Sequence, residues 1–321
     1  MDSIYLSSQN KTYDLALLDY EWQVALVTLY SSTAVLSFTS NVLAIYILLS
    51  HDRFNSEMWK FLVNLSIADI FMALMGIPFT YTSFMLGRWI FPNWMCPVVQ
   101  FAQLCSVFVS ITTLTVIGFD RFFAIVYPFH SLACLRQHTS RVLILIWIVG
   151  ISLSSIMFFK TKAVPFPHGD EIFYDCREEW DEQQGRYFTI AVFMFTFGLP
   201  VAVLMFVYTS IGVRIIRRTT PGNPNELRDS VQWTLKIKAI KMLVTVVIIF
   251  IICWLPIHVH GFIVWFYPPN VNNLHGYLTY VISFFICFRD LFCHRKYRST
   301  RSEAELERLS NLTNVPSNPI V

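Results

Sequence analysis

Long apolar segments dominate this chain and leave few folds open to it. Six segments with little or no charge lie at 24–49, 61–86, 98–119, 142–159, 187–213 and 242–266, and a shorter seventh lies at 274–288. A helix needs roughly 20 apolar residues to cross the hydrocarbon core of a bilayer. Charged residues make up only 14% of the chain, whereas a soluble domain carries about 25%. The sequence therefore predicts an all-α integral membrane protein, a bundle of seven transmembrane helices.

The loops between these segments differ in charge from one side of the bundle to the other. The connection 214–241 carries seven Lys or Arg residues against two acidic ones, whereas the connection 160–186 carries seven Asp or Glu against four basic ones. Lys and Arg are enriched in the cytoplasmic loops of membrane proteins. We therefore expect a multi-pass protein of the plasma membrane with an extracellular N-terminus, in which Asn10 of the sequon Asn10-Lys11-Thr12 is glycosylated.

One membrane domain with two polar ends is predicted: an extracellular N-terminus at 1–23, a seven-helix domain at 24–293 and a cytoplasmic tail at 294–321. No short apolar stretch with a cleavage site opens the chain, so we expect no cleaved signal peptide. The net charge of +3 does not favour nucleic acid as a partner. We expect no enzyme, because no metal-ligand cluster, nucleophile–base set or phosphate-binding loop occurs in the sequence.

The cysteines predict one disulfide. Of the seven, only Cys96 and Cys176 fall on the outer side and outside the lipid. The oxidising exterior of the cell allows two such thiols to pair. The bridge would pin the acidic loop over the end of the bundle, although two free thiols are the alternative.

Polar residues inside the apolar segments carry a resemblance to a known family. They are Asn41, Asp69, Asp120-Arg121-Phe122 at the end of the third segment, Trp147, Pro200, Tyr208 and the stretch from Phe250 through Trp254 to Pro256. Polar groups are costly in a bilayer and usually functional. This set, in this order and with 25 residues from Cys96 to Arg121, resembles the rhodopsin-like (class A) G-protein-coupled receptors over about residues 1–288.

The resemblance implies a role for each polar residue. Asn41 and Asp69 would help form a polar cluster that holds an allosteric sodium ion, the alternative being a protonated Asp69 without an ion. No other cofactor is expected. Asp120 would pair with Arg121 at the cytoplasmic mouth, and activation would free Arg121 to meet a heterotrimeric G protein. Phe122 replaces the usual Tyr of the family.

Four further residues of the resemblance concern the movement of helices. Prolines remove a backbone hydrogen bond and kink a helix, so Pro200 and Pro256 would bend the fifth and sixth helices. Trp254 would form the aromatic pivot beneath the ligand, and plain core packing is its alternative. Tyr208 in the fifth segment would receive the seventh helix during activation.

Two charged residues that known receptor classes use to bind their ligands are absent from this sequence, and this narrows the class of ligand. Gln103 stands where amine receptors place an Asp, and 274–288 contains no Lys for a retinal Schiff base. The acidic outer loop favours a cationic or amidated ligand, unless it is merely solvated. The segments Phe91–Cys96, 238–243 and 254–258 resemble neuropeptide receptors of the leucokinin, tachykinin and RYamide types. The expected peptide contacts are Gln100, Gln103, His258 and Phe262.

The last apolar segment departs from the family pattern. The superfamily carries Asn-Pro-x-x-Tyr in its seventh helix, whereas the corresponding window Asp290–Arg295 contains neither Pro nor Tyr. The 15 residues of 274–288 reach roughly 22 Å, less than the roughly 30 Å of the hydrocarbon core. We therefore expect a short or divergent seventh helix. The alternatives are a receptor-like variant that binds ligand or partner receptors without full signalling, and a secondary transporter, although no inverted repeat supports the latter.

Overall fold

The computed structural model describes residues 20–50, 58–126, 138–217 and 244–266, with the exception of 246, 249 and 253. Its helices are α1 (Tyr20–Ser50), α2 (Met58–Phe71), α3 (Ile77–Leu86), α4 (Met95–Val126), α6 (Thr139–Ser154), α7 (Met157–Lys160), α8 (Glu182–Phe193) and α9 (Leu199–Arg217). Two π-helical turns, η1 (Met72–Gly76) and η2 (Met194–Gly198), and two strands, β1 (Thr161–His168) and β2 (Glu171–Glu178), complete these ranges. A further helix spans Phe250–Phe266.

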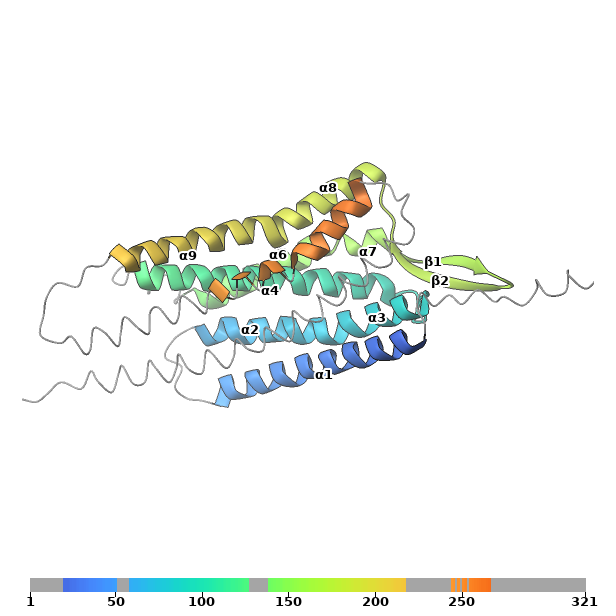
Figure 1. The fold of residues 1–321 in the computed structure, drawn as a ribbon, viewed down its shortest axis with the longest axis horizontal. Coiled ribbons are helices and arrows are strands. Elements are labelled where there is room, and N and C mark those ends of the chain that lie inside the picture. The colour runs from blue at the N-terminus through green and yellow to red at the C-terminus, as the bar shows by residue number, and fades with distance from the viewer. Residues whose placement is uncertain are drawn as a thin grey trace, which may run out of the picture.

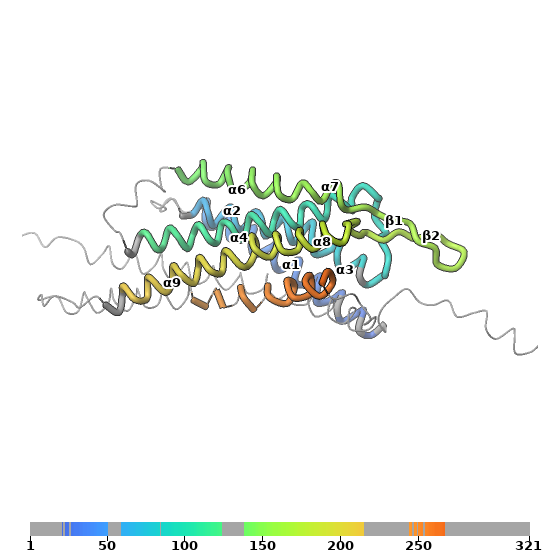
Figure 2. The backbone as a smooth tube through the Cα atoms, turned by 90° about the horizontal axis from the view of Figure 1, so that it is seen from above, coloured from blue at the N-terminus to red at the C-terminus, as the bar shows by residue number. Residues whose placement is uncertain are grey.

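The helices lie side by side along the long axis of the molecule (Figure 1). Helix α4 is central, because it contacts α2, α6, α7, α9 and both π-helical turns. It begins at Met95 with Pro97 in its first turn, where the missing N–H of proline removes no helical hydrogen bond. Viewed from above, the helix Phe250–Phe266 runs beside α9 and α8 (Figure 2).

The outward sides of the helices are apolar. On α6, the side chains Ile144, Leu145 and Ile148 are about 60% exposed (60%, 59% and 59%). Within the described residues, five helical segments are long and apolar enough to cross a membrane: Gln23–Ser50, Trp59–Ser83, Met95–Phe123, Thr139–Lys160 and Glu182–Arg214. They confirm the first five predicted membrane segments. The sixth predicted segment contains the shorter apolar helix Phe250–Phe266, and the seventh, 274–288, lies outside the described residues.

Two membrane helices contain a π-helical turn just before a proline. In η1 the N–H of Ile77 bonds the carbonyl of Met72, and in η2 the N–H of Leu199 bonds the carbonyl of Met194. Pro78 and Pro200 follow these turns directly. Because proline cannot donate the regular i to i−4 bond, a wider turn before it lets the helix continue. The predicted irregularity at Pro200 is therefore present, and η1 at Pro78 is a second one that the sequence analysis did not single out.

A buried polar contact joins three helices at the middle of the bundle. Asn64 of α2 donates its amide to the Thr113 hydroxyl of α4 at 2.8 Å and accepts a hydrogen bond from the Trp147 indole of α6 at 2.7 Å. Buried polar groups are costly unless they are paired. Trp147, a residue of the family resemblance, therefore has a structural role: its indole bonds Asn64 and links α6 to α2.

The acidic outer loop forms a β-hairpin rather than an irregular connection. Strands β1 and β2 pair antiparallel from Thr161↔Glu178 to His168↔Glu171, and the hairpin projects beyond the end of the bundle (Figure 1). Gly169 has a φ of +63° and Asp170 does not have a positive φ, which is the pattern of a type II′ turn. This small sheet is an addition to the predicted helical bundle.

Candidate ligand-binding site

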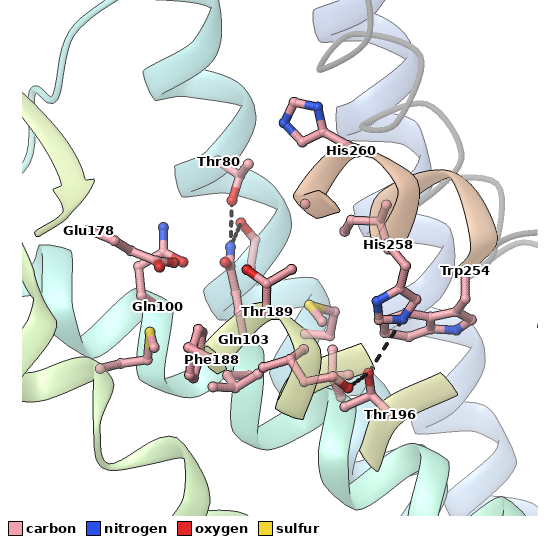
Figure 3. A pocket seen from close by; sticks show the side chains of 18 of the residues that line it. Thr80, Gln100, Gln103, Glu178, Phe188, Thr189, Thr196, Trp254, His258 and His260 are labelled. Carbon is pink, nitrogen blue, oxygen red and sulfur yellow. Dashed lines mark hydrogen bonds between the residues drawn. The ribbon is translucent and has the colours of Figure 1, made fainter. Parts of the chain in front are cut away.

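A cavity of about 360 Å³ lies at the hairpin end of the bundle, between α4, α8 and the helix Phe250–Phe266. Its wall combines apolar and aromatic side chains with a few polar ones, as ligand sites in proteins do. The polar and charged residues of the lining are Thr80, Gln100, Gln103, Glu178, Thr189, Thr196, His258 and His260 (Figure 3). They come from segments far apart in the sequence, so only the folded bundle brings them together.

The hairpin is held against the end of the bundle covalently and by backbone contacts. Cys96 at the start of α4 and Cys176 of β2 form a disulfide, with an S–S distance of 2.07 Å and Cα atoms 5.7 Å apart. The backbone N–H of Trp89 donates to the carbonyl of Tyr174 at 2.7 Å, and the Arg88 guanidinium lies 4.5 Å from the Phe173 ring centroid. The predicted disulfide is confirmed, and it places β2 beside the cavity.

Gln103 is the centre of the polar wall. Its side-chain Nε2 donates to the carbonyl of Gly76 at 3.2 Å and to the hydroxyl of Thr80. Both hydrogens of the amide are thereby engaged, and its Oε1 remains an acceptor. Gln100, one turn away on α4, also lines the cavity. Two of the residues predicted to contact a peptide, Gln100 and Gln103, therefore face the same cavity. Both present a neutral amide group and not a charged carboxylate.

His258 lies deeper, in an aromatic wall. It is 7% exposed, and its Nε2 is 3.4 Å from the hydroxyl of Thr196. Its ring packs against Phe193 and Phe197 of the α8–η2 segment, with centroids 5.4 and 5.1 Å away. His258 lines the cavity as expected, but most of its surface serves packing between the fifth and sixth membrane segments.

Phe262 occupies a different place from the other expected peptide contacts. Its ring lies 5.2 Å from Phe193 and 5.6 Å from Phe266, measured between centroids, and it is not among the residues that line the cavity. Phe262 therefore packs the outer ends of two helices together. Its predicted contact with a ligand would require a peptide that extends beyond the cavity.

Trp254 closes the inner end of the cavity. It is 7% exposed and belongs to a buried cluster with Ile111, Phe197 and Phe250. Its ring stacks on His258 with centroids 6.1 Å apart. Pro256 follows two residues later in the same helix. A ligand that displaces His258 or Trp254 would thus press on the core between α4 and the helix Phe250–Phe266.

The opposite end of the bundle carries the charged pair of the third membrane helix. Asp120 and Arg121 form a salt bridge at 3.5 Å, and the side chain of Arg121 is 33% exposed. Nearby, Tyr208 of α9 lies in a buried cluster with Leu204, Val207, Ile211 and Val247, against which Phe122 packs. The predicted ion pair is present, and Phe122 uses its ring for packing where a Tyr would add a hydroxyl.

Asp69 and Asn41 lie in the middle of the bundle and bond different partners. Asp69 is 8% exposed and accepts a hydrogen bond from the Ser110 hydroxyl at 3.3 Å. Asn41 donates to the carbonyl of Ser37 on its own helix at 2.9 Å. The carboxylate and hydroxyl oxygens at Asp69 suit a hard cation. The predicted glycosylation site, Asn10, lies outside the described residues.

Comparisons with known proteins place this arrangement in a family. The family model for the 7 transmembrane receptor (rhodopsin family) matches residues 40–304. The chain belongs to the rhodopsin family of receptors. The match covers most of the chain and includes the seventh apolar segment, so the seven-helix fold class is confirmed. Because this is a family of receptors, the transporter and enzyme alternatives are excluded, and nothing in the match supports a non-signalling receptor-like variant.

Relatives of this receptor refine the family assignment. It is 33% identical over 247 residues to the RYamide receptor of Tribolium castaneum, which covers 73% of this chain and 66% of the relative. It is 30% identical to the substance-K receptor of Mus musculus, over 74% of this chain and 62% of the relative. It is 29% identical to the substance-P receptor of Meriones unguiculatus, over 83% and 64%. The predicted likeness to RYamide and tachykinin receptors is confirmed, and the aligned part spans less than two thirds of each relative.

Several residues of the receptor's cavity were missed by sequence reasoning. Glu178, Thr80 and His260 line it but were not candidates. Glu178 could have been found, because it lies two residues after Cys176 and alternate residues of a strand share one face. Thr80 had no comparable signal, since its position depends on how α3 is rotated toward α4.

Proposed function

We propose that this chain is a receptor for an extracellular peptide and that it activates heterotrimeric G proteins at the plasma membrane, with its N-terminus outside the cell. The observation that carries the proposal is the cavity beneath the disulfide-anchored hairpin, whose polar centre is Gln103. Amine receptors place a carboxylate at the position of Gln103 to pair with the ligand ammonium, and Gln103 carries no charge. The relatives named for RYamide, substance K and substance P support a peptide as the ligand.

An amidated C-terminus fits the polar wall better than a free carboxylate. Gln103 presents an acceptor oxygen after both amide hydrogens are engaged, and a C-terminal amide has N–H groups to donate. A free C-terminal carboxylate would instead approach Glu178, and like charges repel at short range. Among the described residues that line the cavity, none is a Lys or Arg that could neutralise it.

Signal transfer is proposed to run along the aromatic core toward the Asp120–Arg121 pair. His258 and Trp254 at the bottom of the cavity join a buried cluster with Phe250 on the same helix. Movement of that helix would alter its packing on α9, because Val247 contacts the Tyr208 cluster. Arg121 would then exchange Asp120 for a G protein, assisted by the basic connection 214–241.

We further propose that Asp69 holds a sodium ion in the resting receptor, with Ser110 and Asn41 nearby. Affinity for an agonist should then be higher in choline chloride than in sodium chloride, since the ion favours the resting state. Asp69→Asn should remove that difference. A sodium effect that persists unchanged in Asp69→Asn would contradict the proposal.

The test of the proposed function is a signalling screen. Cells that express the chain are exposed to RYamide, substance P and substance K peptides, each as the amide and as the free acid, while calcium and cAMP are recorded. We expect a response to at least one amide and a response at least tenfold weaker to its free acid. Mock-transfected cells are the control. Silence toward all amidated peptides, at verified surface expression, would overturn the peptide-receptor proposal.

A further inference from the structure

The cavity contains a carboxylate that sequence reasoning did not assign. Glu178, at the end of β2, is the only Asp or Glu among the described residues that line it. Thr161, its partner in the hairpin register, is buried, and Cys176 two residues earlier is bonded to Cys96 of α4. The disulfide thus fixes where the Glu178 carboxylate enters the cavity wall. Figure 3 shows it on the side of the cavity that also carries Gln100.

One oxygen of this carboxylate is held, and the other is open. The Trp180 indole donates to Oε2 of Glu178 at 2.6 Å, and the Trp180 ring is itself stacked on Phe188 of α8 with centroids 4.5 Å apart. Among the described residues, none donates a hydrogen bond to Oε1 and none forms a salt bridge with Glu178. The indole therefore orients the carboxylate without neutralising it.

The neighbouring bases have other partners. The Lys160 ammonium donates to the neutral Gln184 amide at 2.7 Å and lies over the Trp180 ring, 5.1 Å from its centroid. Lys162 pairs with Glu179 at 3.5 Å, and Arg186 pairs with Glu182. Glu178 is exposed as a whole residue, although nearby protein partly desolvates its carboxyl group. This desolvation raises the pKa of Glu178, against the opposing effect of the Trp180 hydrogen bond. A cation brought by a ligand would compensate the desolvated charge.

We propose that Glu178 binds a basic side chain of the peptide, an arginine or lysine near its amidated end, and so selects for basic peptides. The inference rests on the proposed function as a peptide receptor. Gln100 and Gln103 stand one turn apart on α4, about 4.5 Å along the helix. One residue of an extended peptide spans roughly 3.5 Å. If the C-terminal amide of the peptide binds Gln103, the next one or two residues of the peptide therefore lie beside Gln100 and Glu178.

The binding chemistry favours arginine over lysine. A guanidinium is planar and presents several donors, so it can bond the open Oε1 while its face remains available to aromatic rings. The Phe188 ring lines the same cavity as the Glu178 carboxylate. An arginine-bearing peptide should therefore bind more tightly than its lysine analogue.

The experiment is a double-mutant cycle, in which the receptor and the peptide are changed separately and together. The probes are labelled RYamide and substance P peptides, each made with its basic residues intact and with every arginine and lysine replaced by neutral citrulline and acetyl-lysine. Glu178→Gln keeps the size of the side chain and the hydrogen bond from Trp180 but removes the charge. Glu179→Gln is the matched control, because Glu179 is the adjacent acid, pairs with Lys162 and does not line the cavity.

We expect Glu178→Gln to weaken binding of a basic peptide by roughly 10- to 100-fold, the range for a charge-assisted contact. Binding of the neutral analogue, which also reports that the variant folds, should change less than about threefold. Glu179→Gln should resemble the unmodified receptor. Equal losses for both peptides, or an equal loss in Glu179→Gln, would overturn the role of Glu178. Loss of all peptide binding by the unmodified receptor would instead overturn the proposed function.

Discussion

The two ends of this receptor are held together in different ways. At the hairpin end, a disulfide, a backbone hydrogen bond from Trp89 to Tyr174 and stacked aromatic rings join loop and helices. At the other end, buried apolar packing of Phe122, Tyr208 and Val247 joins the helices. The salt bridge of Asp120 and Arg121, which are neighbours on α4, spans 3.5 Å there and is partly exposed to solvent. A covalent bond costs much more to break than an exposed ion pair. The hairpin end is therefore cross-linked, whereas the Asp120–Arg121 pair can exchange partners.

Among the changes predicted here, loss of the disulfide at the hairpin end should have the largest effect on surface expression and peptide binding. Cys96→Ser and Cys176→Ser should each abolish surface expression or peptide binding, because removing such a bridge typically costs about 2–5 kcal/mol. The double variant should be no worse than either single one, since both remove the same bond. Surface labelling and peptide binding measure the effect. Clearly additive losses would show that each cysteine acts separately.

Gly185 tests how closely α8 and the sixth membrane segment pack at the ligand end. A Cβ at this position would lie 2.3 Å from the Trp265 ring, while the next residue, Arg186, donates to the Trp265 carbonyl at 3.0 Å. Gly185→Ala should therefore lower thermal stability in detergent by about 1–3 kcal/mol, as overpacking does. Gly212→Ala on α9 is the control, because no atom lies within 4 Å of the added Cβ. Equal stability of the two variants would refute the close packing.

Gln103 and His258 should matter for affinity more than Phe262 does. Gln103→Ala leaves the Gly76 carbonyl and the Thr80 hydroxyl without their donor, and His258→Ala removes a ring from the aromatic wall. Each should weaken peptide binding by about 1–3 kcal/mol, the cost of an unpaired buried partner. Phe262→Leu should change affinity less than about threefold, because Phe262 lies outside the cavity lining. Saturation binding distinguishes these outcomes, and a larger loss at Phe262 would make it a peptide contact.

Asp120→Asn should loosen selectively the end of the bundle opposite the hairpin. An ion pair that is partly exposed contributes about 0–1 kcal/mol, so its loss should raise ligand-free G-protein activation by up to about fivefold. Glu182→Gln, which removes the Arg186 ion pair at the other end, should leave basal activity unchanged. Both are read as basal signalling per receptor at the cell surface. A matching rise in Glu182→Gln would mean that the two ends do not differ.

Acid should weaken binding of a basic peptide in a way that depends on Glu178. Burial raises the pKa of Glu178 from its ordinary value of 4.5, so affinity is full above the raised pKa and falls as the pH is lowered through it. The fall should begin at a higher pH than for an ordinary carboxyl group. His260, Lys160 and Arg186 also lie near this end of the cavity, and all three remain in Glu178→Gln. A pH dependence unchanged in that variant would therefore show that Glu178 is not its cause.

Much of the fold was predictable because its causes are local in the sequence. The cost of polar groups in lipid sets the length of each apolar segment, and five such segments are helices of the expected length. The pair Cys96 and Cys176 was predictable because these two cysteines alone were expected on the outer side and outside the lipid. The Asp120–Arg121 ion pair was predictable because the two residues are consecutive in the sequence.

The candidate site was only partly predictable, because a membrane helix is apolar on all sides. Hydrophobic periodicity then does not tell which residues face inward. Gln100, Gln103 and His258 line the cavity, whereas Phe262, one turn beyond His258 on the same helix, packs against Phe193 instead. Thr80 lines the cavity as well, from a helix that enters after the π-helical turn η1.

By itself, the sequence determined the membrane bundle, the disulfide and the residues that mark a rhodopsin-family receptor, and it predicts the orientation of the bundle. These follow from hydrophobic length, loop charge and residue type, which act within a segment or across one membrane face. The tertiary structure decided that the acidic loop is a hairpin, that Glu178 reaches the cavity beside Gln100, and that Gly185 lies against Trp265. Those contacts depend on strand register and on helix rotation, where a shift of one residue turns a side chain by about 100° around a helix or to the opposite face of a strand.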